Sequence, residues 1–300
     1  MIYSVIPYPV INYYTKVRSL EKGKDTECEK SRVYVGEGGV YTSVMLKNLG
    51  YMNMTVGFIP DDVVGQFIEE ALLKNGCSTG FVPVHSNGSD CINLHLDSVK
   101  STGIFGKGLS VTKKDIEHLY GKLDLITEGD TLILTGGIPK GFPEDYYTDI
   151  LKNFGDRGID IVSDTDNPSI KEVLEYNPFL IRADKKGIEK YFDTTLKDAS
   201  SAAWYAGELV KQGAQNVIVY LGNEGTILVS DDGSAFHSPA PKGNVVNTVG
   251  ARESLAAGFV AGYLDSEGDL KYAYNMGIAA CNATAFTEDI ATAENVRALM

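Results

Sequence analysis

The residues with the clearest capacity for chemistry lie at positions 247–264, where a polar turn containing a glycine leads into small and apolar residues without proline. This pattern predicts a loop that opens directly onto a buried helix. The first amides of such a helix have no partner within it, and the aligned peptide dipoles favour negative charge there, so a phosphate or a developing anion is stabilised. Glu253, in the first turn, could accept a proton from a hydroxyl held beside that phosphate.

The same stretch has a purely structural interpretation. Glu253 could do no more than complement the helix dipole. The small residues could serve only the close packing of the helix against its neighbours, and they are Ala256, Ala257, Gly258, Ala261 and Gly262. On this stretch alone, the structural interpretation is favoured.

Residues 247–258 resemble the signature of the pfkB (ribokinase-like) carbohydrate kinases, Asp/Asn-Thr-x-Gly-Ala-Gly-Asp-Ser/Ala-x-x-x-Gly. The Asn-Thr-Val-Gly start is similar to that of the 1-phosphofructokinase and tagatose-6-phosphate kinase branch. The resemblance implies that the loop amides around Gly250 and Ala251 form the anion hole for the transferred phosphoryl group. It also implies ATP and Mg²⁺ as cofactors. In the family the signature Asp takes the proton from the substrate hydroxyl, and Glu253 stands in its place.

Arg252 stands where the family has its second signature glycine, which lets backbone amides approach the phosphoryl group. Its long side chain could block that approach or pair with Glu253. It could equally supply positive charge that stabilises the transfer, as arginine fingers do. The sequence leaves open whether the chain is a working kinase or a kinase fold that has lost the reaction.

Composition bounds the size and the partners of the protein. The 300 residues, 43% of them hydrophobic, can form one large α/β domain with a smaller subdomain, or two modest domains. The formal net charge of -13 argues against nucleic acid or an anionic membrane as the partner, since both need clustered Lys and Arg. An acidic protein can still hold a basic pocket, so anionic small molecules remain open as ligands.

The cysteines are scattered without CxxC spacing, at Cys28, Cys77, Cys91 and Cys281, and the histidines are equally dispersed. A structural zinc site or a disulfide framework is therefore not expected, and the cytoplasm is the expected location. Residues 1–6 have no basic flank or long apolar core, and no segment reaches the length of a transmembrane helix.

Hydrophobic periodicity predicts alternating strands and helices with one interruption. A strand at 2–6 precedes two alternating strands at 10–17 and 28–35, and the glycine loop 36–39 opens a helix that Gly50 ends. After a strand at 54–59 and a helix at 64–75, three short strands follow without helices. We expect these strands, at 80–84, 90–96 and 101–105, to join the earlier pair in a small antiparallel lid formed by about residues 10–35 and 80–106.

The second half returns to alternation of strand and helix, beginning with a helix at 112–123 capped by Thr112. The remaining elements are expected at strand 131–135, helix 143–153, strand 160–163, helix 170–176, strand 179–181, helix 199–212, strand 216–221 and hairpin 226–237. A doubly wound, mostly parallel α/β sheet with its ligand at the carboxyl ends of the strands follows from this order. The order also resembles the pfkB family from end to end, which implies a single ribokinase-like domain over 1–300 and a homodimer formed through the lid.

The resemblance implies a binding site for a sugar or sugar phosphate, but several residue types differ from the family's. Asn12 stands where the family has Asp, Gly38 where it has Lys, and Tyr41 where it has Asn. Cys91 replaces the Arg that would bind the acceptor's own phosphate. Lys107 and Lys140 could supply the missing charge, although a solvated surface role is favoured for both. Gly39 and Asn93 keep the family's residue types, while Glu37 adds negative charge and Phe105 replaces a lid Asn.

The nucleotide side is closer to the family pattern. Gly222 and Gly225, in Leu-Gly-Asn-Glu-Gly, resemble the tight turn that brings backbone near the triphosphate. Thr248 and Gly250 keep the signature, and Asn282 stands where the family often contacts adenine. The family's metal-orienting Asn-x-x-Glu becomes Asp-Lys-Lys-Gly at 184–187. Asp164 and Asp166 could be metal ligands or only a polar turn after a strand, so no metal ligand is assigned.

Three functions remain compatible with these residues. The first is an ATP-dependent kinase of a sugar or sugar phosphate. The second is a catalytically silent protein that binds a nucleotide or metabolite on a kinase fold. The third is a kinase retuned to a neutral alcohol or nucleoside, which the amide of Asn12 and the ring of Tyr41 favour because an aromatic side chain can stack on a base or a sugar.

Overall fold

A nine-stranded sheet organises the computed structural model, which describes residues 1–19, 21–97, 102–164 and 170–300. Seven neighbouring strands run parallel, and the last two pair antiparallel at one edge. The order across the sheet is β15 (Ala235–Ser238), β14 (Thr226–Ser230), β13 (Asn216–Tyr220), β12 (Leu180–Asp184), β11 (Asp160–Asp164), β10 (Thr131–Thr135), β1 (Ile2–Val5), β4 (Asn53–Val56) and β6 (Ser78–Thr79). The predicted α/β fold class is confirmed.

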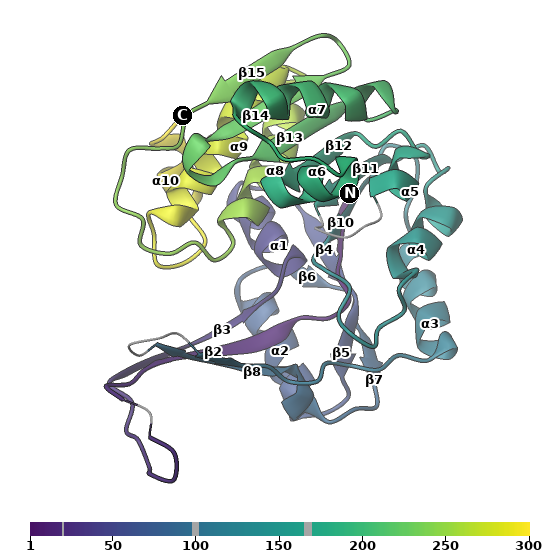
Figure 1. The fold of residues 1–300 in the computed structure, drawn as a ribbon. Coiled ribbons are helices and arrows are strands. Elements are labelled where there is room, and N and C mark those ends of the chain that lie inside the picture. The colour runs from purple at the N-terminus through teal and green to yellow at the C-terminus, as the bar shows by residue number, and fades with distance from the viewer. Residues whose placement is uncertain (20, 98–101, 165–169) are drawn as a thin grey trace.

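Helices cover both faces of this sheet, because alternate strand residues point to opposite sides. Ile133 packs with one set of helices, whereas Leu132 and Leu134 pack with the other. The first set is α1 (Gly39–Asn48), α8 (Ala251–Asp265), α9 (Leu270–Ala285) and α10 (Ala293–Arg297). The opposite face carries α3 (Lys113–Leu123), α4 (Tyr146–Phe154), α5 (Ile170–Leu174), α6 (Lys185–Phe192) and α7 (Ala199–Lys211). Figure 1 shows the two layers.

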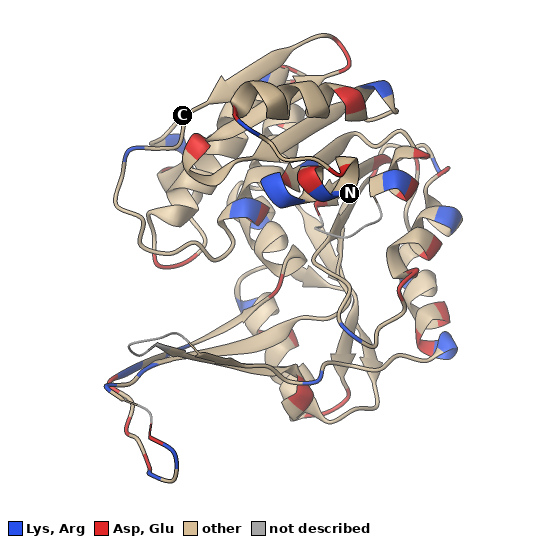
Figure 2. Ribbon diagram, viewed as in Figure 1, with Lys and Arg blue, Asp and Glu red and all other residues tan. Residues whose placement is uncertain are grey.

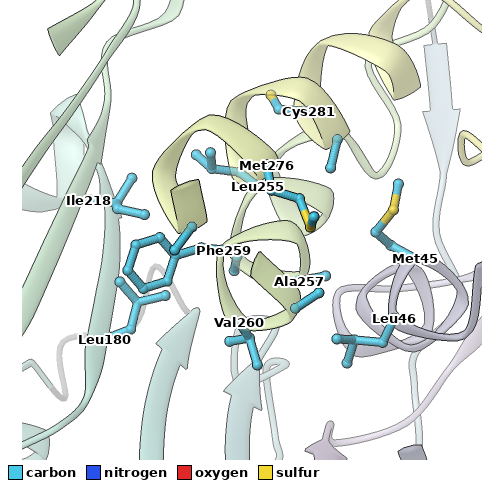
Figure 3. Close-up of a cluster of buried hydrophobic side chains, with 14 of the residues drawn as sticks. Met45, Leu46, Leu180, Ile218, Leu255, Ala257, Phe259, Val260, Met276 and Cys281 are labelled. Atoms are coloured by element: carbon cyan, nitrogen blue, oxygen red, sulfur yellow. The ribbon is translucent and has the colours of Figure 1, made fainter. Parts of the chain in front are cut away.

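The helix pair α8 and α9 forms the centre of one core. Figure 3 shows Leu255 and Phe259 of α8 between α9, α1 and the strand residues Leu180 and Ile218. Gly258 makes the close approach, because a Cβ there would lie 2.8 Å from Cβ of Ala280 and 2.8 Å from the carbonyl oxygen of Met276. At Gly258, the close packing predicted for the small residues of this helix is therefore observed.

A four-stranded sheet projects from the body of the molecule and forms the lid (Figure 1). Its order is β3 (Lys30–Gly36), β2 (Val10–Lys16), β8 (Ile92–Asp97) and β9 (Thr102–Ile104). The pairs β2–β3 and β8–β9 are antiparallel, but β2 and β8 run parallel. Charged residues gather in the connection between β2 and β3 (Figure 2), where Arg18 pairs with Glu29 at 2.6 Å.

The strand expected at 80–84 does not belong to the lid. It is β7 (Val82–Val84), which pairs in parallel with β5 (Phe58–Pro60) in a separate two-stranded sheet beside α2 (Val63–Lys74). Val82 and Val84 turn into the main core instead, where they pack with Phe58. The apolar side chains of this strand therefore serve the body of the molecule.

Helix boundaries differ from expectation at two places. The helix expected at 143–153 begins later, at Tyr146, and α6 was not expected at all. Ile188 is buried, and Tyr191 and Phe192 pack against the same core at helical spacing, but eight residues are too few for this periodicity to stand out in the sequence. Its start is fixed by Asp184, whose carboxylate accepts a hydrogen bond from the Gly187 amide at 2.7 Å. Thr112 caps α3 as predicted. Within the described parts of the chain, no helix is long and apolar enough to cross a membrane.

The contact at Gly258 yields a test of the core. Gly258→Ala places a methyl group against backbone atoms of α9, and we expect it to lower the free energy of unfolding by ~1–3 kcal/mol. Gly207→Ala in α7 is the matched control, because nothing lies within 4 Å of its added Cβ. That variant should gain ~0.4–1 kcal/mol from reduced freedom of the unfolded chain. Urea unfolding measures both, and equal stability of the two variants would contradict the close approach.

Candidate active site

A cavity of about 750 Å³ lies between the lid and the body of the molecule, beside the end of β13 and the start of α8. Of the thirteen residues that the sequence assigns to the site, every one except Gly39 lines this cavity. The twelve are Asn12, Gly38, Tyr41, Asn93, Gly222, Gly225, Thr248, Gly250, Ala251, Arg252, Glu253 and Asn282. The structure thus brings together residues from both ends of the chain, while their roles stay predictions.

The loop before α8 has a fixed shape. The Asn247 carboxamide oxygen accepts a hydrogen bond from the Val249 amide at 3.0 Å, and Gly250 then adopts a positive φ of 77° as the residue that caps the helix. A Cβ at Gly250 would lie 2.3 Å from Cδ1 of Ile290. The Ala251 amide donates to the Thr248 carbonyl at 3.3 Å, and the next amides of the first turn have no partner inside the helix, an arrangement suited to an anion.

Glu253 lies among other ionisable groups at this end of α8. Burial raises the pKa of Glu37, and the Glu253 carboxylate raises it further. Burial likewise raises the pKa of Cys281 to about 12, again with a contribution from Glu253. Glu37 and Glu253 both line the cavity, so two carboxyl groups face the same ligand space. A carboxylate in this position can take a proton from a hydroxyl group.

The Arg252 guanidinium pairs across the cavity wall with Asp184. Its Nη1 lies 3.7 Å from Oδ2 of Asp184, the residue whose other oxygen caps α6. The ion pair that the structure gives for Arg252 is therefore with Asp184, at the position of the family's metal-orienting Asn, and its guanidinium is held beside the anion site.

The nucleotide-like turn is closed by two hydrogen bonds, from the Leu221 amide to the Gly225 carbonyl at 2.8 Å and from the Gly225 amide to the Gly222 carbonyl at 3.0 Å. Gly225 has a φ of 95°, and a Cβ there would lie 2.0 Å from the Ser238 carbonyl oxygen. The turn is thus pressed against β15. Across the cavity from it, Asn282 of α9 completes the wall.

The acceptor side is closed by a hydrogen-bonded group of amides. The buried Asn12 donates from Nδ2 to the Gly36 carbonyl at 3.3 Å, and its Oδ1 accepts from Nδ2 of Asn93 at 3.2 Å. Nε2 of His95 lies 3.0 Å from the same oxygen. The ring of Tyr41 covers Gly36, where a Cβ would come within 2.2 Å of it. Both ends of the Asn12 carboxamide are therefore already hydrogen-bonded within the protein.

Two predicted positions lie differently from the resemblance. Gly39 packs the start of α1 against the sheet, because a Cβ there would lie 2.5 Å from Cγ2 of Ile6 and 2.6 Å from Cγ2 of Thr135. Cys91 is fully buried, and burial raises its pKa to about 12. Its thiol is therefore neutral and supplies no charge to the cavity. Lys107 and Lys140 are exposed and do not line the cavity.

Tyr14 and His95 also line the cavity, but no motif in the sequence points to them. Tyr14 follows Asn12 by two residues on β2, and His95 follows Asn93 by two residues on β8. Since side chains two apart on a strand share a face, this alternation could have found both residues.

The acidic residues near the cavity were considered as ligands for Mg²⁺. In the described part of the chain, no group of three or more His, Cys, Asp or Glu could hold a metal ion. Asp164 is fully buried against Arg182, and burial raises its pKa to about 7 while Arg182 opposes the rise. Asp166 lies outside the described residues. Asp184 is engaged by Arg252 and by the cap of α6, so the residues present do not fit a resident Mg²⁺ and no step is derived through one.

The comparisons with known proteins agree with this architecture. A family model described as pfkB family carbohydrate kinase matches residues 5–293. The chain is 29% identical over 300 residues to 1-phosphofructokinase of Bacillus subtilis (strain 168), covering 100% of this chain and 97% of that protein. It is 30% identical over 223 residues to D-tagatose-1-phosphate kinase of Bacillus licheniformis, covering 74% and 72% respectively.

A solved structure gives the same fold. Phosphofructokinase-2 from Escherichia coli in complex with fructose-6-phosphate matches with a TM-score of 0.88 over 99% of this chain and 97% of that one. The sequence identity is 18%, so this likeness concerns the fold alone.

Gly38 yields a test of whether the missing lysine could simply be restored. Its φ is 24°, and a Cβ would lie 2.9 Å from the Gly136 backbone nitrogen. We expect Gly38→Lys to lower the free energy of unfolding by ~1–3 kcal/mol more than Gly141→Lys does. Gly141 is the control because it also has a positive φ, 85°, but nothing lies within 4 Å of its Cβ. Urea unfolding compares them, and equal stability would show that the loop adapts to a side chain at position 38.

Proposed function

Because the chain belongs to the pfkB family of carbohydrate kinases, we propose that it transfers the terminal phosphoryl group of ATP to a hydroxyl group of a small carbohydrate-like acceptor. The observation that carries the proposal is one cavity in which the Glu253 carboxylate, the first amides of α8 and the glycine turn at 222–225 meet. These groups supply a proton acceptor, an anion site and a nucleotide contact, the three requirements of phosphoryl transfer.

In the proposed reaction the acceptor hydroxyl oxygen bonds to the γ-phosphorus of ATP as the bond to the β,γ-bridging oxygen breaks. ADP leaves with that oxygen, and the hydroxyl proton passes to the Glu253 carboxylate. The amides at Gly250 and Ala251 would stabilise the charge on the transferred group. Gly222, Gly225, Thr248 and Asn282 would hold the nucleotide on the other side.

Arg252 decides between this function and a second candidate. Its guanidinium stands where the signature has a glycine and is held beside the anion site by Asp184. Placed against the transferred phosphoryl group, it would stabilise the developing charge. Placed in the anion hole, it would leave a protein that binds nucleotide without turnover, which is the second candidate function.

Domain organisation, assembly and location complete the proposed function. A single domain with the lid as its mobile cover follows from the family, and so does a homodimer that pairs lids. A cytoplasmic location follows from the dispersed thiols, all of which are free. Mg²⁺ would enter with ATP and neutralise phosphate charge.

Nucleotide binding can be tested with matched glycine variants. Gly222 and Gly233 both have positive φ and an open space at Cβ, but only Gly222 lines the cavity. We expect Mg·ATP to bind the native chain in a calorimetric titration, and Gly222→Ala to weaken binding ~10-fold or more because its methyl group enters the nucleotide space. Gly233→Ala should bind as the native chain does. Absence of any binding at millimolar Mg·ATP would contradict the kinase proposal.

Coupling between Arg252 and Glu253 can be tested by restoring the signature. We expect Arg252→Gly with Glu253→Asp to raise ATP turnover by more than the product of the two single effects, because an open anion hole and a correctly placed base serve one step. Neighbours with a shared task couple by ~0.5–3 kcal/mol. ADP release measures turnover, both with water as the acceptor and with a panel of sugars. A fall in turnover on Arg252→Gly alone would show that Arg252 acts as a catalytic cation.

A further inference from the structure

A second cavity, the side cavity, lies beside the candidate active site, between strands β2 and β3 of the lid and the loop that leads into α8. Its volume is about 370 Å³, and it shares part of its wall with the larger cavity. Lys16, Lys30 and Arg32 line it from the lid, all with cationic side chains. Among the described residues of its wall, Glu288 is the one with an acidic side chain. The side cavity is therefore positively charged in a chain whose formal net charge is -13.

The register of the lid strands brings these cations together. Lys16 lies directly opposite Lys30 in the antiparallel pair β2–β3, and Arg32 follows Lys30 by two residues. Because side chains two apart on a strand share a face, Lys30 and Arg32 point toward the same space. Asp97 lies opposite Lys16 on β8, whereas Lys30 is on an edge strand and has only Lys16 opposite it. Like charges directly opposite one another destabilise a strand pair, and an anion bound between them would remove that repulsion.

Arg32 holds the acidic residue of the side cavity in a contact that a ligand can replace. Its guanidinium donates from Nη1 to the Tyr34 hydroxyl at 3.2 Å and pairs through Nη2 with the Glu288 carboxylate. The Arg32 guanidinium lowers the pKa of Glu288, and the Lys30 ammonium adds to this effect, so the three groups lie close together. The Glu288 side chain is 59% exposed, and exposed ion pairs contribute little to stability. Exchange of Glu288 for another anion therefore costs little.

The body wall of the side cavity has its polar groups already bonded. The Asn247 carboxamide donates from Nδ2 to the Glu288 carbonyl at 2.9 Å, and its Oδ1 accepts from the Val249 amide at 3.0 Å. Both ends of this side chain are thus engaged within the loop before α8. The groups with capacity for a ligand are the cations of the lid, so the side cavity is suited to an anion.

We propose that the side cavity is a second anion site, which binds a phosphate-bearing metabolite at Lys16, Lys30 and Arg32. A phosphate monoester carries about -1.5 to -2 charges at pH 7, which two ammonium groups balance. The planar fork of Arg32 fits two phosphate oxygens, and the ligand displaces the Glu288 carboxylate to reach it. A volume of about 370 Å³ lies within the range of small-molecule sites. This site is separate from the spaces assigned to the nucleotide and the acceptor.

Calorimetric titration of the full chain with inorganic pyrophosphate, at an ionic strength held constant with sodium chloride, tests the site. We expect Lys30→Gln to weaken pyrophosphate binding by about 5-fold, the upper range for a partly exposed ion pair. Lys22→Gln is the matched control, because Lys22 is exposed in the connection between β2 and β3 and is not among the residues that line the side cavity. Equal affinities of the two variants, or no binding to the native chain at millimolar pyrophosphate, would overturn the inference.

Glu288→Gln tests the exchange at Arg32. Removal of the competing carboxylate should tighten pyrophosphate binding by about 5-fold, although the variant loses a contact between the lid and the body. Glu294→Gln, which removes the same charge from an exposed position of α10 outside the side cavity, should bind as the native chain does. A purely structural role of the ion pair predicts unchanged or weaker binding in Glu288→Gln, and that result would contradict the proposed exchange.

Arg252→Gln separates the side cavity from the anion site at the start of α8, which pyrophosphate could also enter. We expect this variant to keep the pyrophosphate affinity that Lys30→Gln loses. Loss of binding in Arg252→Gln, together with native affinity in Lys30→Gln, would place the anion at α8 and overturn the inference. Because no nucleotide or acceptor is present, these results stand whether or not the chain releases ADP from ATP.

Discussion

The close packing of α8 against α9 is the constraint on which the site depends. Residues from Ser254 to Gly262 are buried, and the glycine at 258 brings the backbone of α8 against Met276 and Ala280. A helix held this tightly cannot slide or rotate without opening the core in Figure 3. Its first turn, with Gly250 and Glu253, is therefore fixed relative to the sheet. The small residues of α8 that serve its packing therefore also hold the first turn of the helix, with Gly250 and Glu253, in position at the cavity.

The charges at the N-terminus of α8 do not all favour an anion. The amides and the helix dipole favour negative charge, whereas Glu37 and Glu253 oppose it. Arg252 adds a positive charge, but the Asp184 carboxylate, 3.7 Å away, offsets part of it. On the lid side, Arg32 of β3 donates to the Tyr34 hydroxyl at 3.2 Å and pairs with Glu288. It lines a neighbouring cavity that shares Tyr14 and Val249 with the candidate active site.

The sequence predicted those parts whose signals are local. The loop and helix at 247–264, the cap at Thr112 and the alternation of strands and helices all depend on neighbouring residues. The assignment of β7 and the parallel pairing of β2 with β8 depend on contacts between distant segments, which periodicity does not report. Helix α6 was missed because its eight residues are too few for the spacing of Ile188, Tyr191 and Phe192 to stand out as a helical pattern. Of the thirteen residues chosen by resemblance, twelve line one cavity, whereas Gly39 packs against Ile6 and Thr135. Their roles remain predictions.

The parallel pairing of β2 with β8 matters most for the chemistry of the lid. An antiparallel pairing would reverse the order of residues along β8, so that Asn12 and Tyr14 could not both face their present partners. With the observed register, Asn12 meets Asn93 and Tyr14 meets His95 on one face. The amides bind one another and draw in His95, which positions its ring to stack on Tyr14. A hydrogen-bonded pair of amides thus orders an aromatic surface on the lid.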